Sequence, residues 1–548
     1  MLVNGIRGVK EWGSTPVEKA VDKYLAKLPA KLKRKFLTTV RIGLEDHIGK
    51  DAEIMVGSAC SGSDIGFICT EVVVTKVCGL LGIDYKPKHV FACEVHLQKQ
   101  AFLRTQFHPQ YLFANVSDLK NKKAFDVISE QQVYIPMVLV FKAGFSCKSR
   151  TTLSSKAPKH LDCVQRNDPD AETAVTFDGV RGYVERARPA IVILENVQGL
   201  ASKSSADADS DADFVVKSML ALGYWCKMFQ FDCEHFGSCA TRVRLYFVAV
   251  LIDQDLRMVT ELAPQFDWLP GFFESMSIGP FDADNFILTD NEQFAYCENM
   301  CPFADIPSTK AARKDEAWQR EHCDYFREHG IAWPPEITAQ GTDFMEISPN
   351  NFYMRGSLLP RAAELLYYLH IRFPYTGQQI EFVDVAPTMA RVVQHLSDGT
   401  SPWKTIASTI TGGSFMCVRF SNGDSTFVRP LCAVEYFSLI GWDPRYFKPI
   451  TETEAIIKNL SGNAFSAFAI MPTLMLAFAA LGVKVGAATE IRDAIVKSYA
   501  PVVTPDCYDS DEGSDSPTGR FRRQPNGQYP SNAAERVALT AAAAAAET

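Results

Sequence analysis

The first candidate for chemistry is the cysteine in the stretch "MVLVFKAGFSCKSRTTL", from Met137 to Leu153. Cys147 follows an apolar run and a Gly-Phe turn, and Lys148 and Arg150 come close behind it. Most free cysteines are small buried hydrophobic residues, and this one could be the same. In open α/β sheets, however, ligands bind at the carboxyl ends of the strands, where a thiol could act as a nucleophile. The two cations would favour its thiolate form.

A carboxyl group and two arginines follow along the chain. Glu195 ends the apolar run "IVIL", so it has little access to water and we expect its pKa to be perturbed. Two neighbouring parallel strands would then present a thiol and a carboxyl group at one edge of a sheet. Arg242 and Arg244 stand two residues apart before another strand, so side-chain alternation places both on the same side.

The stretch "GSACSGSDIG", from Gly57 to Gly66, predicts a ligand-binding loop. Its small residues would let a ligand approach the backbone, and the N-terminus of the next helix favours polar groups. The next predicted strand ends at Glu94, and carboxylates at this place commonly accept hydrogen bonds from ribose hydroxyls. Together these features predict a cofactor that contains a nucleoside, although an acid at a strand end can also be merely solvated.

These candidates need a parallel sheet to bring them together. Continuous apolar runs are typical of strands that are buried on both faces of such a sheet. Helical patterns such as "DGVRGYVERARP" lie between the runs, so we predict an α/β fold with a mostly parallel, Rossmann-like sheet. The predicted strands cover residues 53–59, 89–94, 136–144 and 189–197, and an edge hairpin covers 225–232 and 245–252.

The chain has 548 residues, and a chain of this length is expected to form roughly two to four structural units. Thr15, Pro16 and Glu18 predict a capped helix start near the N-terminus. The predicted regions are an N-terminal helical extension (1–50), a catalytic α/β domain (51–254), an irregular region rich in proline and aromatic residues (255–425), a return segment that completes the catalytic domain (426–498) and a disordered polar tail (499–548).

Composition limits the possible settings. The 15 cysteines are irregularly spaced and no secretory signal opens the chain, so we expect a reducing intracellular compartment, the nucleus if the organism is eukaryotic. The formal net charge of −8 argues against binding nucleic acid through overall charge but allows a local basic cleft. The apolar stretch from Ala467 contains Pro472 and is followed by Lys484, which favours a buried core helix over a membrane span.

Seven motifs resemble those of the DNA (cytosine-5)-methyltransferases and occur in that family's order. "CSGSDIG" resembles the family's loop for S-adenosylmethionine, "ACEVH" its ribose-binding acid, "AGFSCKS" its nucleophile loop and "ILENVQG" its Glu-Asn-Val motif. "FGSCATRVRLYF" resembles the Gln-x-Arg-x-Arg motif, and "RPLCAVEYFSLIGW" and "LSGNAFSAF" resemble the last two blocks. The resemblance covers residues 53–252 and about 402–485.

The resemblance implies methyl transfer from S-adenosylmethionine to C5 of cytosine in DNA. Cys147 would add to C6 of a flipped-out base, Glu195 would share a proton with N3, Arg244 would hold O2 and Arg242 would support the loop. Region 255–425 would select the target, and water would accept the C5 proton. The implied cofactor-binding residues are Cys60, Ser61, Gly62, Ser63, Asp64, Glu94, Val95, Asn115, Val116, Asn463 and Ala464.

The sequence departs from the family pattern at several of these positions. Ser146 and Lys148 flank the cysteine where the family has proline and glutamine, and Ala240 replaces the glutamine before Arg242. Asn115 stands in place of an aspartate that faces the adenine amino group, although its carbonyl could still accept that bond. Further departures are Cys60 and Val95, which stand where the family often has aromatic rings. These changes bear on cofactor affinity and rate more than on reaction type.

Two other functions remain open: an RNA (tRNA) cytosine-5 methyltransferase on the same scaffold, or a scaffold that binds nucleic acid with little turnover. The intact set of Cys147, Glu195 and Arg244 favours an enzyme, whereas the substitutions and the acidic balance favour the scaffold. We expect DNA as the partner, RNA as a possible one, and no membrane. Four residues could in principle bind zinc: Cys297, Cys301, His322 and Cys323. Their spacing is poor for a structural zinc site, so we predict no metal.

Overall fold

The structure is a computed structural model of the chain. It describes residues 15–48, 52–150, 162–252, 259, 262–288, 315–331, 345–346, 352–354, 360–377, 379–385, 401–411, 414–422, 425–431, 433–442 and 454–498. The predicted disordered tail, 499–548, therefore lies outside the described residues. One compact unit covers Met1–Ala494, and it contains all the elements discussed below except the end of the last helix.

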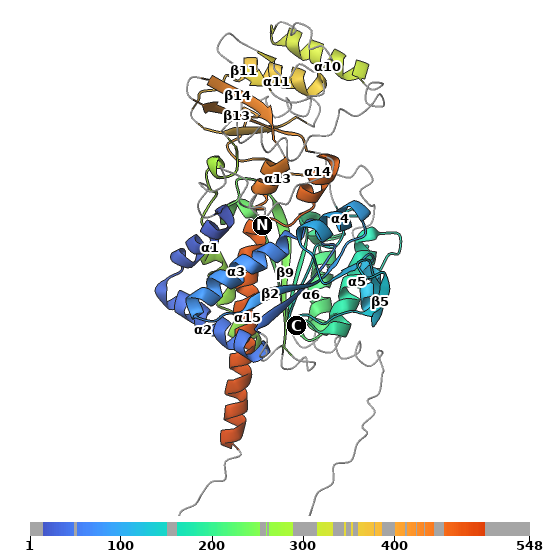
Figure 1. The fold of residues 1–548 in the computed structure, drawn as a ribbon, viewed down its shortest axis with the longest axis vertical. Coiled ribbons are helices and arrows are strands. Elements are labelled where there is room, and N and C mark those ends of the chain that lie inside the picture. Colours follow the sequence, from blue (N-terminus) through green and yellow to red (C-terminus); the bar gives the residue numbers. More distant parts are fainter. Residues whose placement is uncertain are drawn as a thin grey trace, which may run out of the picture. The chain divides into compact units, whose positions relative to one another are not determined.

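A nine-stranded sheet with the order β5-β4-β3-β2-β1-β6-β7-β9-β8 forms the centre of this unit (Figure 1). The strands from β3 to β7 in that order run parallel, which confirms the predicted α/β fold with its Rossmann-like sheet. The hairpin β8–β9 lies at one edge, as predicted; a second antiparallel pair, β4–β5, lies at the other edge and was not predicted. The strands are β1 (Glu53–Ala59), β2 (Lys86–Cys93), β3 (Tyr111–Phe113), β4 (Lys123–Asp126), β5 (Gln131–Tyr134), β6 (Val140–Ala143), β7 (Ile191–Val197), β8 (Tyr224–Asp232) and β9 (Val243–Leu251).

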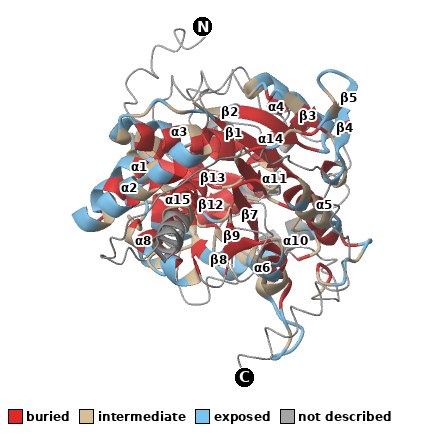
Figure 2. Cartoon of the chain, turned by 90° about the horizontal axis from the view of Figure 1, so that it is seen from below, coloured by how far each residue is buried: buried red, intermediate tan, exposed pale blue. Residues whose placement is uncertain are grey.

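Helices cover both faces of the sheet, so each central strand buries its two alternating sets of side chains in two different cores (Figure 2). In β7, Ile191 and Ile193 belong to the core under α3 and α15, whereas Val192 and Leu194 belong to the core under α5 and α6. This explains the continuous apolar runs of the sequence. The helices named here and the one after β2 are α3 (Ile65–Leu81), α4 (Leu97–Gln106), α5 (Glu172–Ala187), α6 (Asp211–Ala221) and α15 (Ala467–Ser498).

The N-terminal extension forms α1 (Pro16–Lys27) and α2 (Ala30–His47). The predicted cap is confirmed, because Thr15 and Glu18 form a reciprocal capping box and Pro16 opens the helix. The extension is part of the main core, since buried residues of both helices pack with α3 and α15. Gly43 and Gly482 let α2 and α15 approach closely: a Cβ at Gly43 would lie 2.7 Å from the Gly482 nitrogen.

A second sheet, with the order β10-β11-β14-β13-β12, lies within residues 345–430. The predicted irregular region, 255–425, is therefore more regular than its sequence indicates, and its last strand continues to Pro430. Its helices pack on this sheet in a separate small core. The elements are α10 (Asp315–Glu328), β10 (Met345–Glu346), β11 (Phe352–Met354), α11 (Pro360–Arg372), β12 (Glu381–Asp384), β13 (Met416–Asn422) and β14 (Ser425–Pro430).

The boundary that we predicted at residue 255 also differs from the packing. Residues 262–288 include α8 (Leu269–Ser275), and their buried side chains, such as Phe272 and Phe286, belong to the main core with α2 and α15. Aromatic residues and prolines made this stretch resemble the region that follows it, although it covers the catalytic sheet. The short 3₁₀ helices are η2 (Val116–Lys120), η3 (Gln198–Ala201), η4 (Cys233–Phe236), η5 (Ala263–Phe266) and η6 (Ala283–Asn285).

The return segment forms α13 (Ala433–Leu439), α14 (Glu454–Gly462) and α15. Residues 467–486 of α15 are long and apolar enough to span a membrane, but 83% of the segment is buried inside the protein. Its partners are α1, α2, α8 and the sheet, so the packing agrees with the predicted core helix.

Candidate active site

Three neighbouring strands bring the predicted catalytic side chains together. Cys147 follows β6, Glu195 lies near the end of β7, and Arg244 lies near the start of β9, which runs antiparallel to β7. Arg244 Nε lies 3.1 Å from Glu195 Oε1, and the two side chains are 15% and 11% exposed. A thiol, a carboxyl group and a guanidinium thus share one corner of the sheet.

Burial dominates the electrostatics of this corner. It raises the pKa of Glu195, while Arg244 and Arg242 lower that pKa by a smaller amount. Burial also raises the pKa of the Cys147 thiol, and Glu195 raises it further, against the lowering effect of Arg244 and Arg242. The carboxyl group therefore takes up a proton more readily than an exposed glutamate does, and a protonated carboxyl group can donate a hydrogen bond.

Lys148 and Arg150, which we expected to act on the thiol, each contact another group. Lys148 Nζ lies 2.9 Å from Glu172 Oε2, and the buried Arg150 donates to the carbonyl of Gly199 at 2.8 Å. Arg244 and Arg242 lower the pKa of Cys147, so the main charges that favour its thiolate come from the start of β9.

Arg242 connects three segments that are far apart in the sequence. Its guanidinium donates to the carbonyls of Ile410 at 3.1 Å, Gly462 at 3.0 Å and Ala464 at 2.7 Å. Arg242 stands just before β9, and its charge, like that of Arg244, lowers the pKa of Glu195. The arginine thereby joins the catalytic strand to residues from the two later regions.

Local hydrogen bonds hold the loop that carries Cys147. Asn196 Nδ2 donates to the Phe145 carbonyl at 3.0 Å, which ties this loop to the strand that carries Glu195. The Ser146 amide donates to Thr176 Oγ1 on α5, also at 3.0 Å. Ser146, which replaces the family's proline, thus supplies an N–H that proline lacks, so this departure is accommodated by a specific contact.

The predicted cofactor loop lies at the carboxyl ends of β1 and β2. The Gly62 amide donates to Glu94 Oε2 at 3.0 Å, and the Ser61 amide donates to the Cys93 carbonyl at 3.0 Å. A Cβ on Gly62 would meet no atom within 4 Å, so the loop faces open space there. The buried hydroxyl of Ser63 has no hydrogen-bond partner in the described part of the chain.

The other predicted cofactor residues around this loop differ in their exposure and in their hydrogen bonds. The side chain of Val95 is 72% exposed, whereas Val116 is buried in the core beside α5. Asn115 Oδ1 accepts from the Ser117 amide at 3.0 Å and caps η2, so the carbonyl expected to meet adenine already has one partner. The Asp64 carboxylate is buried toward the core, 2.6 Å from Ser58 Oγ, and does not face the open side of the loop.

The last pair of predicted residues lies before α15. Asn463 is exposed and its Nδ2 donates to the carbonyl of Asn459 at 3.0 Å, while Ala464 contributes the carbonyl that Arg242 binds. The neighbouring Phe465 was missed: a Cβ on Gly66 would lie 3.3 Å from its ring, and one on Gly144 would lie 3.2 Å from it. Its ring therefore lies between the cofactor loop and the strand that leads to Cys147.

Two charged residues near Cys60 were also missed. Lys99 on α4 and Glu172 on α5 both influence the pKa of that thiol, which burial raises to about 12. Their signal in the sequence was weak, because lysines and glutamates on helices usually face solvent. Only the positions of the two helices show that these side chains belong to the surroundings of the loop.

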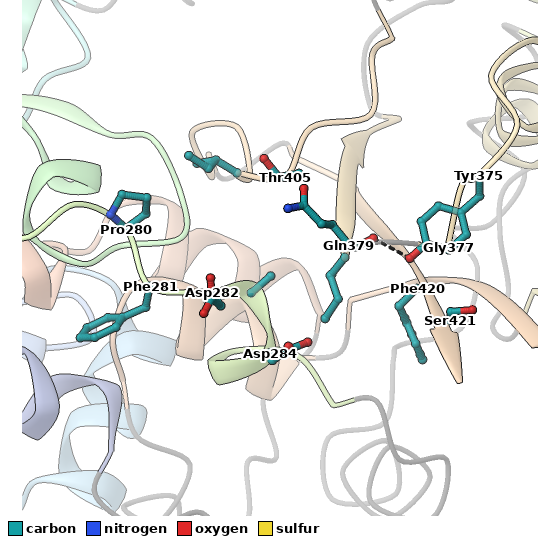
Figure 3. A pocket seen from close by; sticks show the side chains of 13 residues that line it. Pro280, Phe281, Asp282, Asp284, Tyr375, Gly377, Gln379, Thr405, Phe420 and Ser421 are labelled. Carbon is teal, nitrogen blue, oxygen red and sulfur yellow. Dashed lines mark hydrogen bonds between the residues drawn. The ribbon is translucent and has the colours of Figure 1, made fainter. Parts of the chain in front are cut away.

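A hollow of about 680 Å³ lies elsewhere, between residues 280–284 and the second sheet (Figure 3). None of the predicted site residues lines it. Its charged residues are Asp282 and Asp284, both exposed, and carboxylates repel phosphate groups, so this hollow does not suit a nucleic-acid backbone.

No group of three or more His, Cys, Asp or Glu side chains suited to a metal ion occurs within the described ranges. Cys297 and Cys301, the first two zinc candidates, lie outside those ranges, so the zinc hypothesis is not tested.

The chain resembles known proteins over much of its length. The family model of the C-5 cytosine-specific DNA methylases matches residues 81–475. A curated protein named DNA (cytosine-5-)-methyltransferase DMT5, from Cryptococcus neoformans var. grubii, is 27% identical over 198 residues. That match spans 36% of this chain and only 8% of the curated protein.

Solved structures show a more distant likeness. The S. pombe Dnmt2 methyltransferase is 11% identical, with a TM-score of 0.37, over 78% of this chain and 98% of that protein. The Entamoeba histolytica methyltransferase EhMeth is 10% identical, with a TM-score of 0.37, over 78% of this chain and 98% of that protein.

Proposed function

This chain belongs to the C-5 cytosine-specific DNA methylases, and we propose that it transfers a methyl group from S-adenosylmethionine to C5 of cytosine in DNA. The observation that carries the proposal is the grouping of Cys147, Glu195 and Arg244 on adjacent strands, with Glu195 and Arg244 in contact at 3.1 Å. These are the groups that nucleophilic activation of a pyrimidine requires: a nucleophile, a proton donor and a cation.

The residues of the cofactor loop fit S-adenosylmethionine. Gly62 faces open space, Ser63 has a buried hydroxyl without a partner among the described residues, and Glu94 lies at the end of β2 where a ribose would be bound. We assign Glu94 to the ribose hydroxyls and the backbone of residues 60–64 to the methionine end. When bound, S-adenosylmethionine supplies the methyl group that the activated C5 takes up.

The side chains would act in sequence on the base. The Cys147 thiolate forms a bond to C6, the electron pair of the C5–C6 double bond shifts to the C4–C5 bond, and the pair of the C4–N3 double bond takes a proton from Glu195 at N3. The raised pKa of Glu195 supports this role, because a carboxyl group must be protonated to donate. Arg244 would bind O2. As C5 takes up the methyl group, N3 returns its proton to Glu195. Water then takes the C5 proton, and the electron pair of that C–H bond re-forms the C5–C6 double bond as the thiolate leaves C6 with the pair of the C–S bond.

A stacked cytosine is out of reach of this corner, so the target base must leave the duplex. We assign target selection to the second sheet and its helices within region 255–425. The contact of Arg242 with Ile410 supports this assignment, because it connects the start of the β9 strand to region 255–425.

Covalent trapping tests the proposal. DNA with 5-fluorocytosine at the target should form a covalent complex with the protein and S-adenosylmethionine, because fluorine does not leave as a proton does. Cys147→Ser should abolish both the complex and tritiated-methyl transfer, since a hydroxyl is far less ionised than a thiol near neutral pH. An adduct that persists in this variant, or that maps to Cys60 or Cys239, would contradict the assigned nucleophile.

One observation favours a second function, a scaffold that binds nucleic acid with little turnover. The pKa of Cys147 is raised, and the two cations beside it in sequence are engaged elsewhere. Parallel assays with duplex DNA, hemimethylated DNA and tRNA separate the alternatives: cofactor binding without transfer to any of them indicates the scaffold, and transfer to tRNA alone indicates an RNA enzyme.

A further inference from the structure

The cofactor loop has an unfavourable backbone. Cys60 has a φ of 52° and Asp64 a φ of 42°, on either side of Gly62 with 55°. Glycine adopts this left-handed region freely, but the Cβ of other residues is crowded there. Two such residues within five positions persist only if their surroundings hold them, and strain of this kind is common at ligand-binding sites.

Asp64 is held from the core side. It stands at the N-cap of α3, where aspartate usually accepts a hydrogen bond from the helix, but its side chain makes no such bond. Instead its Oδ2 accepts from Ser58 Oγ at 2.6 Å and lies 2.9 Å from Nε2 of His89. The side chains of His89 and Asp64 are only 4% and 2% exposed, so this contact is shielded from water.

His89 itself is fixed in place. It lies on β2 opposite Val56 of β1, and its ring stacks on Phe67 of α3 with 4.4 Å between the ring centroids. Phe107 packs edge-on at 6.1 Å. Neither ring nitrogen has a hydrogen bond of regular geometry in the described part of the chain, so the 2.9 Å approach of Nε2 to Asp64 is a charge contact, and Asp64 is the polar group that this buried imidazole faces.

The opposite side of the loop is held by Glu94, which accepts from the Gly62 amide at 3.0 Å. The loop is therefore fixed between two carboxylates, one on the side assigned to the cofactor and one on the side of the core. Ser61 adds a lateral contact, since its hydroxyl lies 2.7 Å from that of Ser58.

We propose that His89 is a positioning residue for the cofactor: through its contact with Asp64 it holds the loop of residues 60–64 in the strained conformation that binds S-adenosylmethionine. The proposal rests on the proposed function, because it takes that cofactor as the ligand of the loop. His89 does not touch the ligand; it acts through Asp64.

A double-mutant cycle tests the coupling. His89→Phe keeps a ring on Phe67 but removes the donor that faces the Asp64 carboxylate, and we expect the Kd for S-adenosylmethionine to rise about tenfold or more. Asp64→Gly removes the carboxylate and adopts a positive φ without strain. In the Asp64→Gly background, His89→Phe should change the Kd by less than about twofold. His89→Gln, which keeps an N–H donor, should recover part of the affinity in the otherwise unchanged protein.

Equal losses in both backgrounds would show that His89 acts only by packing, and an unchanged Kd in His89→Phe would overturn the proposal outright. Glu381→Gln is the matched control: it weakens a partly buried contact with Arg419 in the second sheet, so it should lower Tm without changing the Kd. A fall in Tm with an unchanged Kd in this variant separates general destabilisation from loss of the loop conformation.

Hydrogen exchange of the amides of residues 60–66 provides a readout that does not need the cofactor. His89→Phe should increase exchange in this loop and leave that of β7 unchanged. If the unaltered protein fails to bind S-adenosylmethionine, the proposed function fails, and the exchange result alone then decides whether His89 fixes the loop. Unchanged exchange in His89→Phe would overturn the positioning role.

Discussion

Two arginine–glutamate pairs in this chain are both buried but are held in different ways. Glu435 binds Arg429 through two hydrogen bonds, at 2.7 and 2.6 Å, and also accepts from the Leu288 amide at 2.9 Å. Arg429 donates in turn to the Leu288 carbonyl at 2.6 Å. The pair therefore joins Leu288 to Arg429 and Glu435, and both carboxylate oxygens accept hydrogen bonds.

Glu195 meets Arg244 through a single contact of 3.1 Å within the described part of the chain. Burial raises the pKa of Glu195 in spite of this arginine and Arg242. The comparison shows that burial of an acid beside a base does not by itself define a role. A fully matched pair fixes structure, whereas a carboxyl group that is buried with fewer contacts is available for proton transfer.

The largest expected effect comes from Glu195→Gln. The amide is similar in shape but has no acidic proton, so kcat/KM for methyl transfer should fall between about a hundredfold and ten thousandfold. S-adenosylmethionine affinity, measured by calorimetry, should remain, because the cofactor loop lies on other strands. A fall in kcat/KM of less than about tenfold would mean that Glu195 is not a proton donor, and the two pairs would then not differ in role.

The matching change, Glu435→Gln, should act on stability. It leaves the buried Arg429 guanidinium facing a neutral amide, and breaking a buried pair in this way costs about 3–5 kcal/mol of unfolding free energy. Chemical denaturation measures this loss. The kcat of the fraction that remains folded should stay within about threefold of the original value; a folded variant that has lost turnover would give Glu435 a catalytic role instead.

A third pair gives an intermediate case. Arg419 Nε lies 2.7 Å from Glu381 Oε2, but the Glu381 side chain is 22% exposed. Water can replace part of the lost contact, so Glu381→Gln should lower the unfolding free energy by about 1–2 kcal/mol. If Glu381→Gln lowered the unfolding free energy as much as Glu435→Gln does, the exposure of the glutamate would not explain the difference between these pairs.

The smallest effect is a pH dependence. The folded pKa of Glu195 is raised, so the folded state binds this proton more tightly than the unfolded state does. Its contribution to stability is therefore present below the unfolded pKa and is lost as the pH rises through the folded pKa. Relative to Glu195→Gln, the unaltered protein should lose at most about 1.4 kcal/mol per pH unit across that window. Denaturation curves at several pH values measure the difference, and a slope of opposite sign would contradict the raised pKa.

Much of the catalytic half could be predicted because its signals are local. The apolar runs predicted β1 and β7 nearly to the residue, and the Thr15–Glu18 capping box was read directly from four positions. The edge pair β4–β5 was missed because each strand has only four residues and neither contains a continuous apolar run. The second sheet was missed because its strands are short and pair across long separations, such as Phe352 with Thr426.

The sequence by itself determined which groups are available and the order in which strands deliver them: Cys147, then Glu195, then Arg244. Residue type and strand period are local properties, so they can be read without contacts. Only the tertiary structure decided how those groups are used. It paired Lys148 with Glu172, turned Asp64 toward His89 and brought Phe465 beside Gly144, because charge partners and burial depend on residues that are distant in the chain.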